Sequence, residues 1–453
     1  MKKYKSLIVF DSNCDLPVYD EVDVLVAGGG PAGIAAAETA ARHNNKTLLV
    51  ERLGFLGGAS VAGYSGTFCG MFYGCDNPLE EEPRQAVFGW TNKFYEALKE
   101  KNGVTEPQPY GKTFLVPHNP QIFKEVAEDM ILEAGGKILY HSTIVGVIKD
   151  FDEFKGVVID TKSGLAQIRS KVMIDATGDA DIIYRAGYEY TMGDNGVIQN
   201  PTMIFRLGGV DVKKFFDYWG EDRISPDKVT EAMKQAIEEG AELPRLKVWV
   251  YHTTRPNELF MNVTLLTGRD GHLLNVCDPD DHTEAEQVAR KQVNEYAKFF
   301  KEYIPGCEAS FVNDLSCEVG VRQTRSIVGI DKLLNEDVKN ARKRSDGIVA
   351  CPWPIELHNG EKPYLFWLIN DYYEVPYGAL VPAVGENLIV AGRNLSAEHH
   401  ALASCRVISQ CFGYGHAAAL AADKSIKENI KFRDIKGEEI RKLLNEEDAR
   451  LGE

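Results

Sequence analysis

Hydrophobic and polar positions divide the first fifty residues into three segments. An unbroken apolar run, VDVLVA at residues 22–27, leads through GGGPAG into an alanine-rich stretch, IAAAETAARH, and a second apolar run, KTLLVE, follows. Continuous apolar runs predict buried strands, and the alanine-rich stretch predicts a helix between them. Two strands joined through a helix form a βαβ unit with parallel strands. We therefore expect an α/β fold.

Similar patterns continue downstream. Helices are predicted over residues 90–103, 117–136 and 283–304, and strands over residues 137–150, 155–164 and 168–179. Residues 54–75 are rich in glycine and other small residues, which favours a loop that packs closely against a ligand. Near residue 385 the early pattern returns, with the strand GENLIVAGR followed by an alanine-rich helix over residues 404–426.

The distribution of these patterns predicts two domains that interleave in sequence. A discontinuous Rossmann-like nucleotide domain would take residues 20–75, 115–200 and 375–430. Residues 200–375 carry scattered aromatic residues and short strand patterns such as LKVWVYHTT, so an α+β substrate domain would take residues 76–114 and 201–374. The charged residues 431–453 would form a solvated helical tail.

Three glycines in the first turn carry the strongest chemical signal. Gly28, Gly30 and Gly33 fill G-x-G-x-x-G between the first strand and its helix. The first glycine permits the turn, the second lets a pyrophosphate approach the backbone, and the third lets helix and strand pack closely. Glu51 ends the next strand eighteen positions after Gly33, where it can accept hydrogen bonds from ribose hydroxyls. The alternative is that the glycines form an ordinary turn and that Glu51 is an ordinary charge at a strand end. Neither would require this spacing of strand, turn, helix and acidic residue, so we expect a dinucleotide-binding site.

Composition narrows the class of protein. The chain has 453 residues, of which 44% are hydrophobic, enough for a large core. Its net charge of −16 disfavours nucleic acid as a partner. Nine cysteines spread over a long chain fit a reducing compartment, and no apolar stretch approaches the roughly 20 residues that span a bilayer. We expect a cytoplasmic protein without a membrane span.

Several segments resemble a known group of enzymes. An NAD domain would continue with further βαβ repeats, whereas here the loop LGGASVAGYSG follows Glu51, as in FAD enzymes of the glutathione reductase-like superfamily. IDATGDAD, EVGVRQTRSIVG, VPYGALVP, NLIVAGR and SCRVISQCFGYGHAAALAA follow in the order found in FAD-dependent oxidoreductases related to fumarate reductase flavoproteins. The resemblance covers most of residues 22–425 and implies FAD as the cofactor.

The resemblance also implies roles for individual residues. It places on the ADP half of FAD Gly28, Gly30, Gly33, Glu51 and Arg52. It places near the flavin or along the return of the chain to the phosphates Gly57, Gly58, Ser60, Ala176, Thr177, Gly178, Asp179, Gly392 and Arg393. A helix that opens at about Gly415 and His416 would point its N-terminus at the isoalloxazine ring.

The cysteine pattern excludes some relatives of this group. A second G-x-G-x-x-G unit for NAD(P)H is absent, and Cys69 and Cys75 do not form the C-x-x-x-x-C pair of a disulfide reductase. The sequence also lacks a C-x-x-C cluster, so we expect no iron–sulfur relay and no metal site.

Candidates for chemistry beyond the flavin are less specific. His399 and His400 lie between the late glycine strand and the last helix, so either is a candidate proton carrier or substrate ligand, with helix capping or core packing as the alternative. Several basic residues could clamp a substrate carboxylate or simply pair with acidic neighbours: Arg322, Arg325, Arg406, His252 and Arg255. Cys69, Tyr64 and Tyr73 lie in the flavin-side loop, where packing is the simpler role.

The predicted function is hydride transfer between FAD and a small organic substrate. Two alternatives are an FAD-containing electron-transfer subunit and a protein whose FAD is structural. The sequence leaves open whether the protein uses a separate electron donor or acceptor. It also leaves open whether the protein forms a homo-oligomer.

Overall fold

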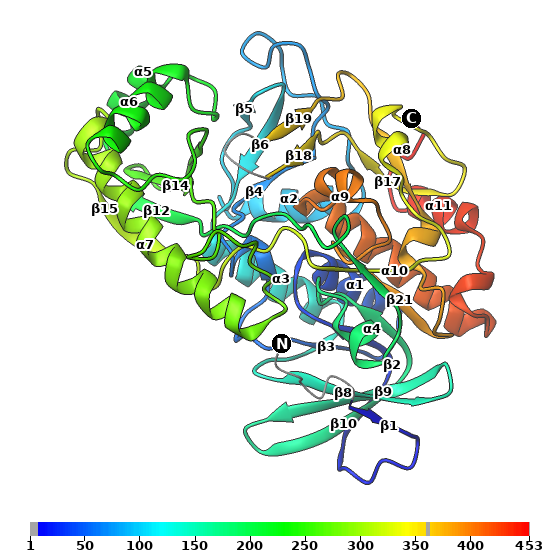
Figure 1. Cartoon of the computed structure of the whole chain (residues 1–453). Helices are drawn as coiled ribbons and strands as arrows, with labels where there is room; N and C mark the ends of the chain where they lie inside the picture. Colours follow the sequence, from blue (N-terminus) through cyan, green and yellow to red (C-terminus); the bar gives the residue numbers. More distant parts are fainter. Residues whose placement is uncertain (1–7, 359–362, 453) are drawn as a thin grey trace.

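The computed structural model describes residues 8–358 and 363–452 (Figure 1). Its largest sheet consists of β1 (Val9–Phe10), β2 (Val18–Ala27), β3 (Thr47–Val50), β7 (Lys137–Leu139), β8 (Thr143–Asp150), β9 (Glu153–Thr161), β10 (Gly164–Asp175) and β21 (Leu388–Val390). The strand order is β1-β8-β9-β10-β2-β3-β7, and β21 pairs with β10. Strands β7, β3, β2, β10 and β21 are parallel to their neighbours in this series, which confirms the predicted α/β fold.

Helices from both ends of the chain contribute to the largest core, which lies on one face of this sheet. They are α1 (Pro31–Arg42), α2 (Trp90–Glu100), α3 (Pro120–Glu133), α9 (His399–Cys405) and α10 (Ile408–Glu428). Side chains of β2 alternate between the two faces, so Val24 and Val26 join the helices in the largest core. Leu25 and Ala27 instead face β8, β9 and α4 (Asp181–Arg185).

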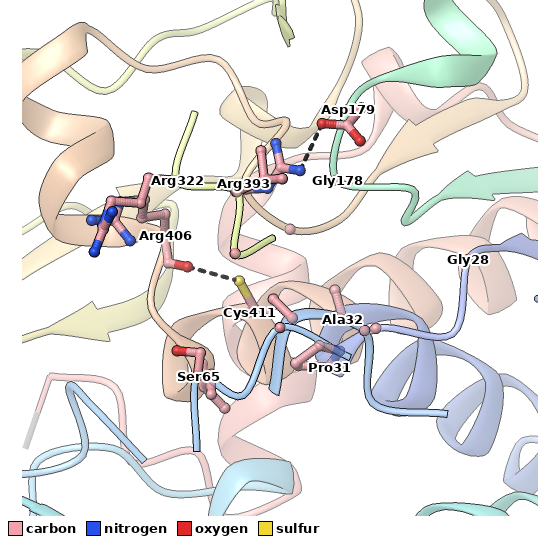
Figure 2. Close-up of a pocket in the computed structure, with 18 of the residues that line it drawn as sticks. Gly28, Pro31, Ala32, Ser65, Gly178, Asp179, Arg322, Arg393, Arg406 and Cys411 are labelled. Carbon is pink, nitrogen blue, oxygen red and sulfur yellow. Dashed lines mark hydrogen bonds and ion pairs between the residues drawn. The ribbon is translucent and has the colours of Figure 1, made fainter. Parts of the chain in front are cut away.

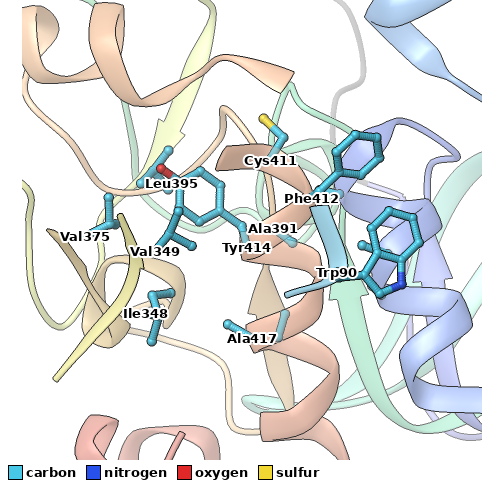
Figure 3. Packing of buried hydrophobic residues seen from close by; sticks show 14 of the residues in the cluster. Trp90, Ile348, Val349, Val375, Ala391, Leu395, Cys411, Phe412, Tyr414 and Ala417 are labelled. Carbon is cyan, nitrogen blue, oxygen red and sulfur yellow. The ribbon is translucent and has the colours of Figure 1, made fainter. Parts of the chain in front are cut away.

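Helix α10 crosses α1 at a point where only glycine fits. A Cβ on Gly415 would lie 2.0 Å from the carbonyl oxygen of Ala32. On its other sides α10 carries large side chains, and Figure 3 shows Phe412 towards Trp90 and Tyr414 towards Val349. The crossing places the start of α10 next to the start of α1, so both helices begin near the same space.

Two segments predicted for the substrate domain pack into this same core. Trp90 and Phe94 of α2 lie against Phe412, with ring centroids 5.0 and 4.9 Å apart. The pair β17 (Gly347–Cys351) and β20 (Tyr373–Pro376) also joins it, together with α8 (Asn335–Lys339) and the 3-10 helix η2 (Tyr377–Leu380). The nucleotide domain therefore draws on more of the chain than its predicted segments.

A second core lies on the left of Figure 1, around a four-stranded antiparallel sheet. The order β13-β14-β12-β15 joins β12 (Phe205–Gly208), β13 (Trp249–His252), β14 (Glu258–Asn262) and β15 (Phe311–Leu315). Three helices pack on it: α5 (Val212–Trp219), α6 (Asp227–Glu238) and α7 (Pro279–Tyr303). Among the described residues, no helix is long and apolar enough to cross a membrane.

Short elements complete the fold. They are η1 (Gly58–Ser60), β4 (Thr67–Phe68), β5 (Gln108–Tyr110), β6 (Thr113–Pro117), β11 (Tyr190–Met192), β16 (Arg325–Ile327), β18 (Ile355–Leu357), β19 (Tyr364–Phe366) and η3 (Phe432–Asp434). Strands β4, β6 and β5 form one sheet, and β11–β16 and β18–β19 are two-stranded pairs. Residues of η1, β4, β5 and β18 line the pocket described below.

The C-terminal tail is packed, contrary to the prediction that it is solvated. Helix α11 (Gly437–Glu446) buries Ile440 and Leu444, and Leu451 after it is buried too. The apolar residues recur four apart, so one face of this charged helix meets the main core. Just beyond it, Glu447 contacts Arg42 and His43 at the end of α1.

Candidate functional site

One pocket runs from the start of α1 towards the second core, and its two ends differ. The dinucleotide end is lined by Gly28, Gly29, Gly30, Pro31, Ala32, Glu51, Arg52, Ala176, Thr177, Gly178, Asp179, Gly392 and Arg393. The inner end is lined by Cys69, Tyr110, Tyr251, Asn262, Arg322, Trp353, Glu356, His358 and Arg406. Figure 2 shows Arg393 with Asp179 towards the first end and Arg322 beside Arg406 at the other.

The three motif glycines have separate structural roles. Gly28 has φ +97°, and a Cβ on Gly33 would lie only 1.8 Å from the Gly28 carbonyl oxygen, so these two form the turn and the helix–strand contact. A Cβ on Gly30 would find its nearest protein atom, the Cα of Gly58, at 4.0 Å. A side chain at position 30 would therefore not clash with the protein itself. It would occupy space in the pocket that glycine leaves open.

Helix α1 presents its N-terminus to this space. Gly30 is its N-cap, no side chain accepts a hydrogen bond from its first amides, and Pro31 follows. Free amides and the helix dipole favour an anionic group such as a pyrophosphate. The cradle therefore fits the diphosphate of a dinucleotide.

Glu51 is buried beside the glycine turn. Its carboxylate accepts hydrogen bonds from the backbone N–H groups of Gly29 at 2.7 Å and Leu53 at 2.8 Å. Burial raises the pKa of Glu51, while these two hydrogen bonds favour the ionised form. Each oxygen keeps a lone pair for a ribose hydroxyl. Arg52 also lines the pocket and pairs with Glu318.

Ion pairs close the far wall of the dinucleotide end. Arg393 Nη2 lies 2.6 Å from Asp179, and although burial opposes ionisation, this guanidinium holds the pKa of Asp179 below its ordinary value. Arg325 Nη2 lies 2.6 Å from Asp181, and its Nε donates to the Asp179 carbonyl at 2.7 Å. Arg325 does not line the pocket. It lies beside the dinucleotide end and binds two residues that do line it, Asp179 and Asp181.

The last helix opens earlier than predicted. Val407 is extended and separates α9 from α10, which begins at Ile408, two turns before Gly415 and His416. Val407, Ile408 and Cys411 line the pocket. Gly415 instead serves the crossing with α1, and His416 Nε2 lies 2.8 Å from Glu447, away from the pocket. The prediction of a helix N-terminus at Gly415 and His416 is therefore wrong.

Residues predicted near the flavin side divide between the pocket and its surroundings. Gly58 lines the pocket opposite Gly30. Gly57 has φ +119° and precedes η1, and the hydroxyl of Ser60 is buried without a hydrogen-bond partner. The structure does not place Gly57 or Ser60 among the lining residues.

The two adjacent histidines do not line the pocket. His399 and His400 start α9, with their ring centroids 5.8 Å apart, and His400 lies 5.8 Å from the ring of Tyr364. Burial and the neighbouring His400 lower the pKa of His399.

Two further predicted basic residues are occupied elsewhere. His252 stacks on Phe216 with centroids 4.1 Å apart, and Arg255 Nη1 lies 3.6 Å from Glu258. Neither lines the pocket.

Arg322 and Arg406 do converge, at the inner end. Arg322 Nη1 donates to the Asn200 carbonyl at 2.7 Å, and Arg406 Nη2 lies 3.3 Å from Gln199 Oε1. The Nε of Arg406 is buried without a hydrogen-bond partner. Burial and the charges of Arg245 and Arg406 lower the pKa of Arg322 well below its ordinary value.

A chain of hydrogen bonds stands behind these arginines. Arg245 Nη2 lies 2.8 Å from His358 Nδ1, and because a guanidinium only donates, Nδ1 accepts. The proton of the neutral ring is then on Nε2, which lies 3.3 Å from Glu356. Burial and the nearby Arg322 guanidinium lower the pKa of His358 well below 6.5, in agreement with a neutral ring.

Glu356 ends this chain as an ionised carboxylate. Tyr110 donates to it at 2.6 Å, and Tyr110 stacks on Trp353 with ring centroids 5.4 Å apart. Although burial opposes ionisation, His358, Tyr110 and Arg406 lower the pKa of Glu356 to about 2. The sequence pattern did not single out four residues of this end: Tyr110, Tyr251, Glu356 and His358. The alternation of Glu356 and His358 in an otherwise apolar strand is the signal that could have found two of them.

Comparison with known proteins finds relatives that match part of this chain. The chain is 31% identical over 173 residues to thiamine thiazole synthase from Methanococcus vannielii, a match that covers 36% of this chain and 59% of that protein. It is 25% identical over 159 residues to digeranylgeranylglycerophospholipid reductase from Thermoplasma volcanium, which covers 34% of this chain and 39% of that protein. The chain thus spans well under two thirds of these relatives.

A solved structure shares the fold over nearly the whole chain. A geranylgeranyl bacteriochlorophyll reductase-like protein from Thermoplasma acidophilum superposes with a TM-score of 0.51 at 16% identity, covering 95% of this chain and 85% of that one. The profile of the family described as FAD dependent oxidoreductase matches residues 23–444. The chain therefore belongs to the FAD dependent oxidoreductase family, whose cofactor the glycine cradle and Glu51 fit.

Proposed function

We propose that this FAD-dependent oxidoreductase exchanges a hydride between flavin N5 and a small polar organic substrate bound at the inner end. The observation that carries the proposal is the continuity of the pocket. The residues that fit a dinucleotide and the buried polar residues around Arg322 line one and the same space. A substrate at the inner end would therefore adjoin the cofactor.

The chain's own residues divide the work of holding FAD. The amides of α1 would bind the diphosphate and Glu51 the ribose, while Arg393 would lie close enough to assist at the phosphates. The N-terminus of α10 at Ile408 would face the ring system. When bound, FAD supplies hydride exchange at N5.

The inner end supports a polar substrate more than a hydrocarbon one. The names of two relatives refer to geranylgeranyl groups, which are long and apolar. Here the charged side chains of Arg322, Arg406 and Glu356 line the cavity, and desolvating their charges against a hydrocarbon would be costly. Tyr251 lines the same end, and burial raises its pKa well above 10, so its hydroxyl stays neutral and can hydrogen-bond to a polar substrate.

We include in this proposal that the protein is related to fumarate reductase flavoproteins. The order of its sequence motifs supports this relationship. The glycine turn, the Ala176–Asp179 segment, the Arg322 segment and the start of α10 follow one another along the chain and meet at one pocket.

An anaerobic exchange experiment tests the proposed function. FAD-loaded protein is reduced and mixed with candidate acceptors, and the oxidised form is mixed with candidate donors, while flavin absorbance is followed. Multiple turnovers with one small molecule are expected. Electron exchange with protein partners alone would instead identify an electron-transfer subunit. Absence of any exchange would indicate a structural FAD.

A further inference from the structure

One carboxylate in the C-terminal tail binds three basic side chains from two helices. Glu447 ends α11, which lies beside α10 (Figure 1). Its carboxylate accepts two hydrogen bonds from Arg42, at 3.1 and 2.6 Å, and lies 2.7 Å from His43 Nε2 and 2.8 Å from His416 Nε2. Arg42 and His43 stand at the end of α1, whereas His416 lies within α10. Both helices start at the cofactor pocket, so Glu447 links them behind it.

The same two helices also touch each other directly. Beside the pocket, Gly415 of α10 meets Ala32 of α1, where a Cβ on the glycine would lie 2.0 Å from the carbonyl oxygen. Farther along, Asp423 of α10 lies 3.4 Å from His43 Nδ1 and accepts a hydrogen bond from Asn45 at 3.0 Å. The helices are therefore fastened at two levels, by glycine packing near the pocket and by polar groups at the end of α1.

Packing of the tail fixes the position of Glu447. Leu444 of α11 is buried in the main core, and the backbone N–H of Gly89 donates to the Asp448 carbonyl at 2.9 Å. His416 is 2% exposed, so its contact with Glu447 is shielded from water. Shielding strengthens an ionic contact because solvent screens less of the charge. A carboxylate fixed in this way can hold the two helices in one relative position.

One of these contacts depends on pH. The charged groups that face His43 are Glu447 from the tail, Asp423 from α10 and Arg42 of its own helix. Asp423 also pairs with Lys427 at 2.8 Å. The hydrogen bond to Glu447 raises the pKa of His43, although burial opposes this. The charged contact is therefore complete below pH 6.5, and it is lost as pH rises through the folded-state pKa of His43.

We propose that Glu447 is a positioning residue for the cofactor site and that protonation of His43 controls how tightly the protein holds FAD. The start of α1 supplies the free amides that fit the diphosphate, and the start of α10 lines the same pocket. Because Glu447 holds both helices, its loss would let their first turns shift relative to each other. Groups that bind one ligand together lose affinity when their spacing changes. The inference concerns FAD retention and holds for any substrate.

Titration of the apoprotein with FAD at about pH 6 and about pH 8.5 tests the inference without turnover. The wild type should bind FAD about 3- to 10-fold more weakly at the higher pH, because His43 has then lost its proton. Glu447→Gln should bind FAD about 10-fold more weakly than the wild type at the lower pH. Glu447→Asp keeps the charge on a shorter side chain and should recover part of this affinity. His43→Gln should remove most of the pH dependence.

Glu439→Gln is the matched control. Glu439 belongs to the same tail helix and pairs with Lys424 of α10 at 3.0 Å, and among the described residues this ion pair reaches α10 alone. The variant removes the same charge from the tail without freeing the end of α1. It should keep the affinity for FAD within about 2-fold of the wild type at both pH values, because an exposed ion pair contributes little.

Two further readouts separate positioning from a purely stabilising role. Urea unfolding shows whether each apoprotein is folded under the titration conditions, and visible circular dichroism of bound FAD reports the surroundings of its ring. We expect Glu447→Gln to change both the affinity and this spectrum in folded protein. Glu447→Asp and His43→Gln carry the same test where Glu447→Gln does not fold.

Three results would overturn the inference. The first is a folded Glu447→Gln protein that is less stable but binds FAD with the affinity and spectrum of the wild type. The second is an equal loss of affinity in Glu439→Gln, and the third is a pH dependence that His43→Gln leaves unchanged. None of these measurements involves electron exchange, so each of these results would leave the proposed function standing. Failure of the proposed hydride exchange would likewise leave this inference standing.

Discussion

The two ends of the pocket are built by different means. The dinucleotide end is formed mainly by backbone, with glycine turns, the amides of α1, and charged side chains that are paired within the protein. The inner end is formed by side chains from segments as distant as Cys69, Tyr251 and Arg406. Among the described residues, Arg322 and Arg406 at this end form hydrogen bonds but no ion pair with a carboxylate. The first end is suited to a constant ligand held by shape, and the second to a polar substrate.

The largest effect on stability is expected for a substitution in the backbone turn of the dinucleotide end. Gly33→Ala should lower the free energy of unfolding by about 3 kcal/mol and abolish FAD retention, because its Cβ would lie 1.8 Å from a backbone oxygen. Gly30→Ala is the matched control, since its Cβ would enter open pocket space. Urea unfolding of both apoproteins and FAD titration provide the measurements.

The Gly30 control has its own expected result. It should leave apoprotein stability within about 1 kcal/mol of wild type and weaken FAD binding by at least about 10-fold. Equal destabilisation of the two apoproteins would refute the division of roles between these glycines.

The next effect tests the side chains of the inner end. Glu356→Gln removes the carboxylate among three guanidiniums and should lower the free energy of unfolding by about 2 kcal/mol at pH 7. Tyr110→Phe removes one hydrogen bond to Glu356 but no charge, so its cost should be nearer 1 kcal/mol. Denaturant unfolding measures both, and a larger cost for Tyr110→Phe would contradict the charge argument.

A smaller effect concerns a side chain at the dinucleotide end. Glu51→Ala should weaken FAD binding by about 10- to 30-fold, because a charge-assisted acceptor for the ribose is lost. Glu51→Gln retains the shape and should lose less affinity. Calorimetric titration of the apoproteins with FAD measures both, and unchanged affinity in Glu51→Ala would show that the ribose lies elsewhere.

The smallest effect contrasts the two ends of α1. Its N-terminus offers free amides, whereas its C-terminus is held by Glu447, which contacts Arg42 and His43. The hydrogen bond to Glu447 raises the pKa of His43 above 6.5, although burial opposes this. The contact therefore stabilises fully below pH 6.5, and its contribution is lost as pH rises through the folded-state pKa.

We expect this loss to be about 1 kcal/mol between pH 6 and pH 8.5, and to disappear in His43→Gln. His252→Gln is the control, because burial and the nearby Arg223 lower the pKa of His252 to about 4, so it does not titrate in this interval. Urea unfolding at the two pH values measures the effect. A pH slope that persists in His43→Gln would exclude this contact as its source.

The same contrast explains what the sequence could predict. The strand, glycine turn, helix and acidic residue of the βαβ unit lie within thirty residues. Their spacing in the sequence is therefore enough to predict their arrangement in space. The inner end has no such local signal. Tyr110 and Glu356 are 246 residues apart, and only the packing of β5 beside β18 brings them within hydrogen-bond distance.

At the last helix, proximity in sequence does not correspond to proximity to the pocket. His399 and His400 follow the glycine strand closely, yet the break at Val407 turns the start of α10 towards the pocket and leaves α9 outside it. Gly415 looked like a cofactor glycine, but the Ala32 carbonyl accounts for it. The break contains neither glycine nor proline, so tertiary packing set it.

The crossing of α10 over α1 has a consequence for how the protein is made. Synthesis delivers Gly28 and Glu51 first, but Arg393 and Ile408 only near the end. A chain still attached to the ribosome lacks one wall of the pocket until Arg393 and Ile408 have been translated. Closure of the pocket around the prosthetic group therefore depends on two parts of the chain that are translated far apart in time, and a product that stops before Arg393 would lack this wall.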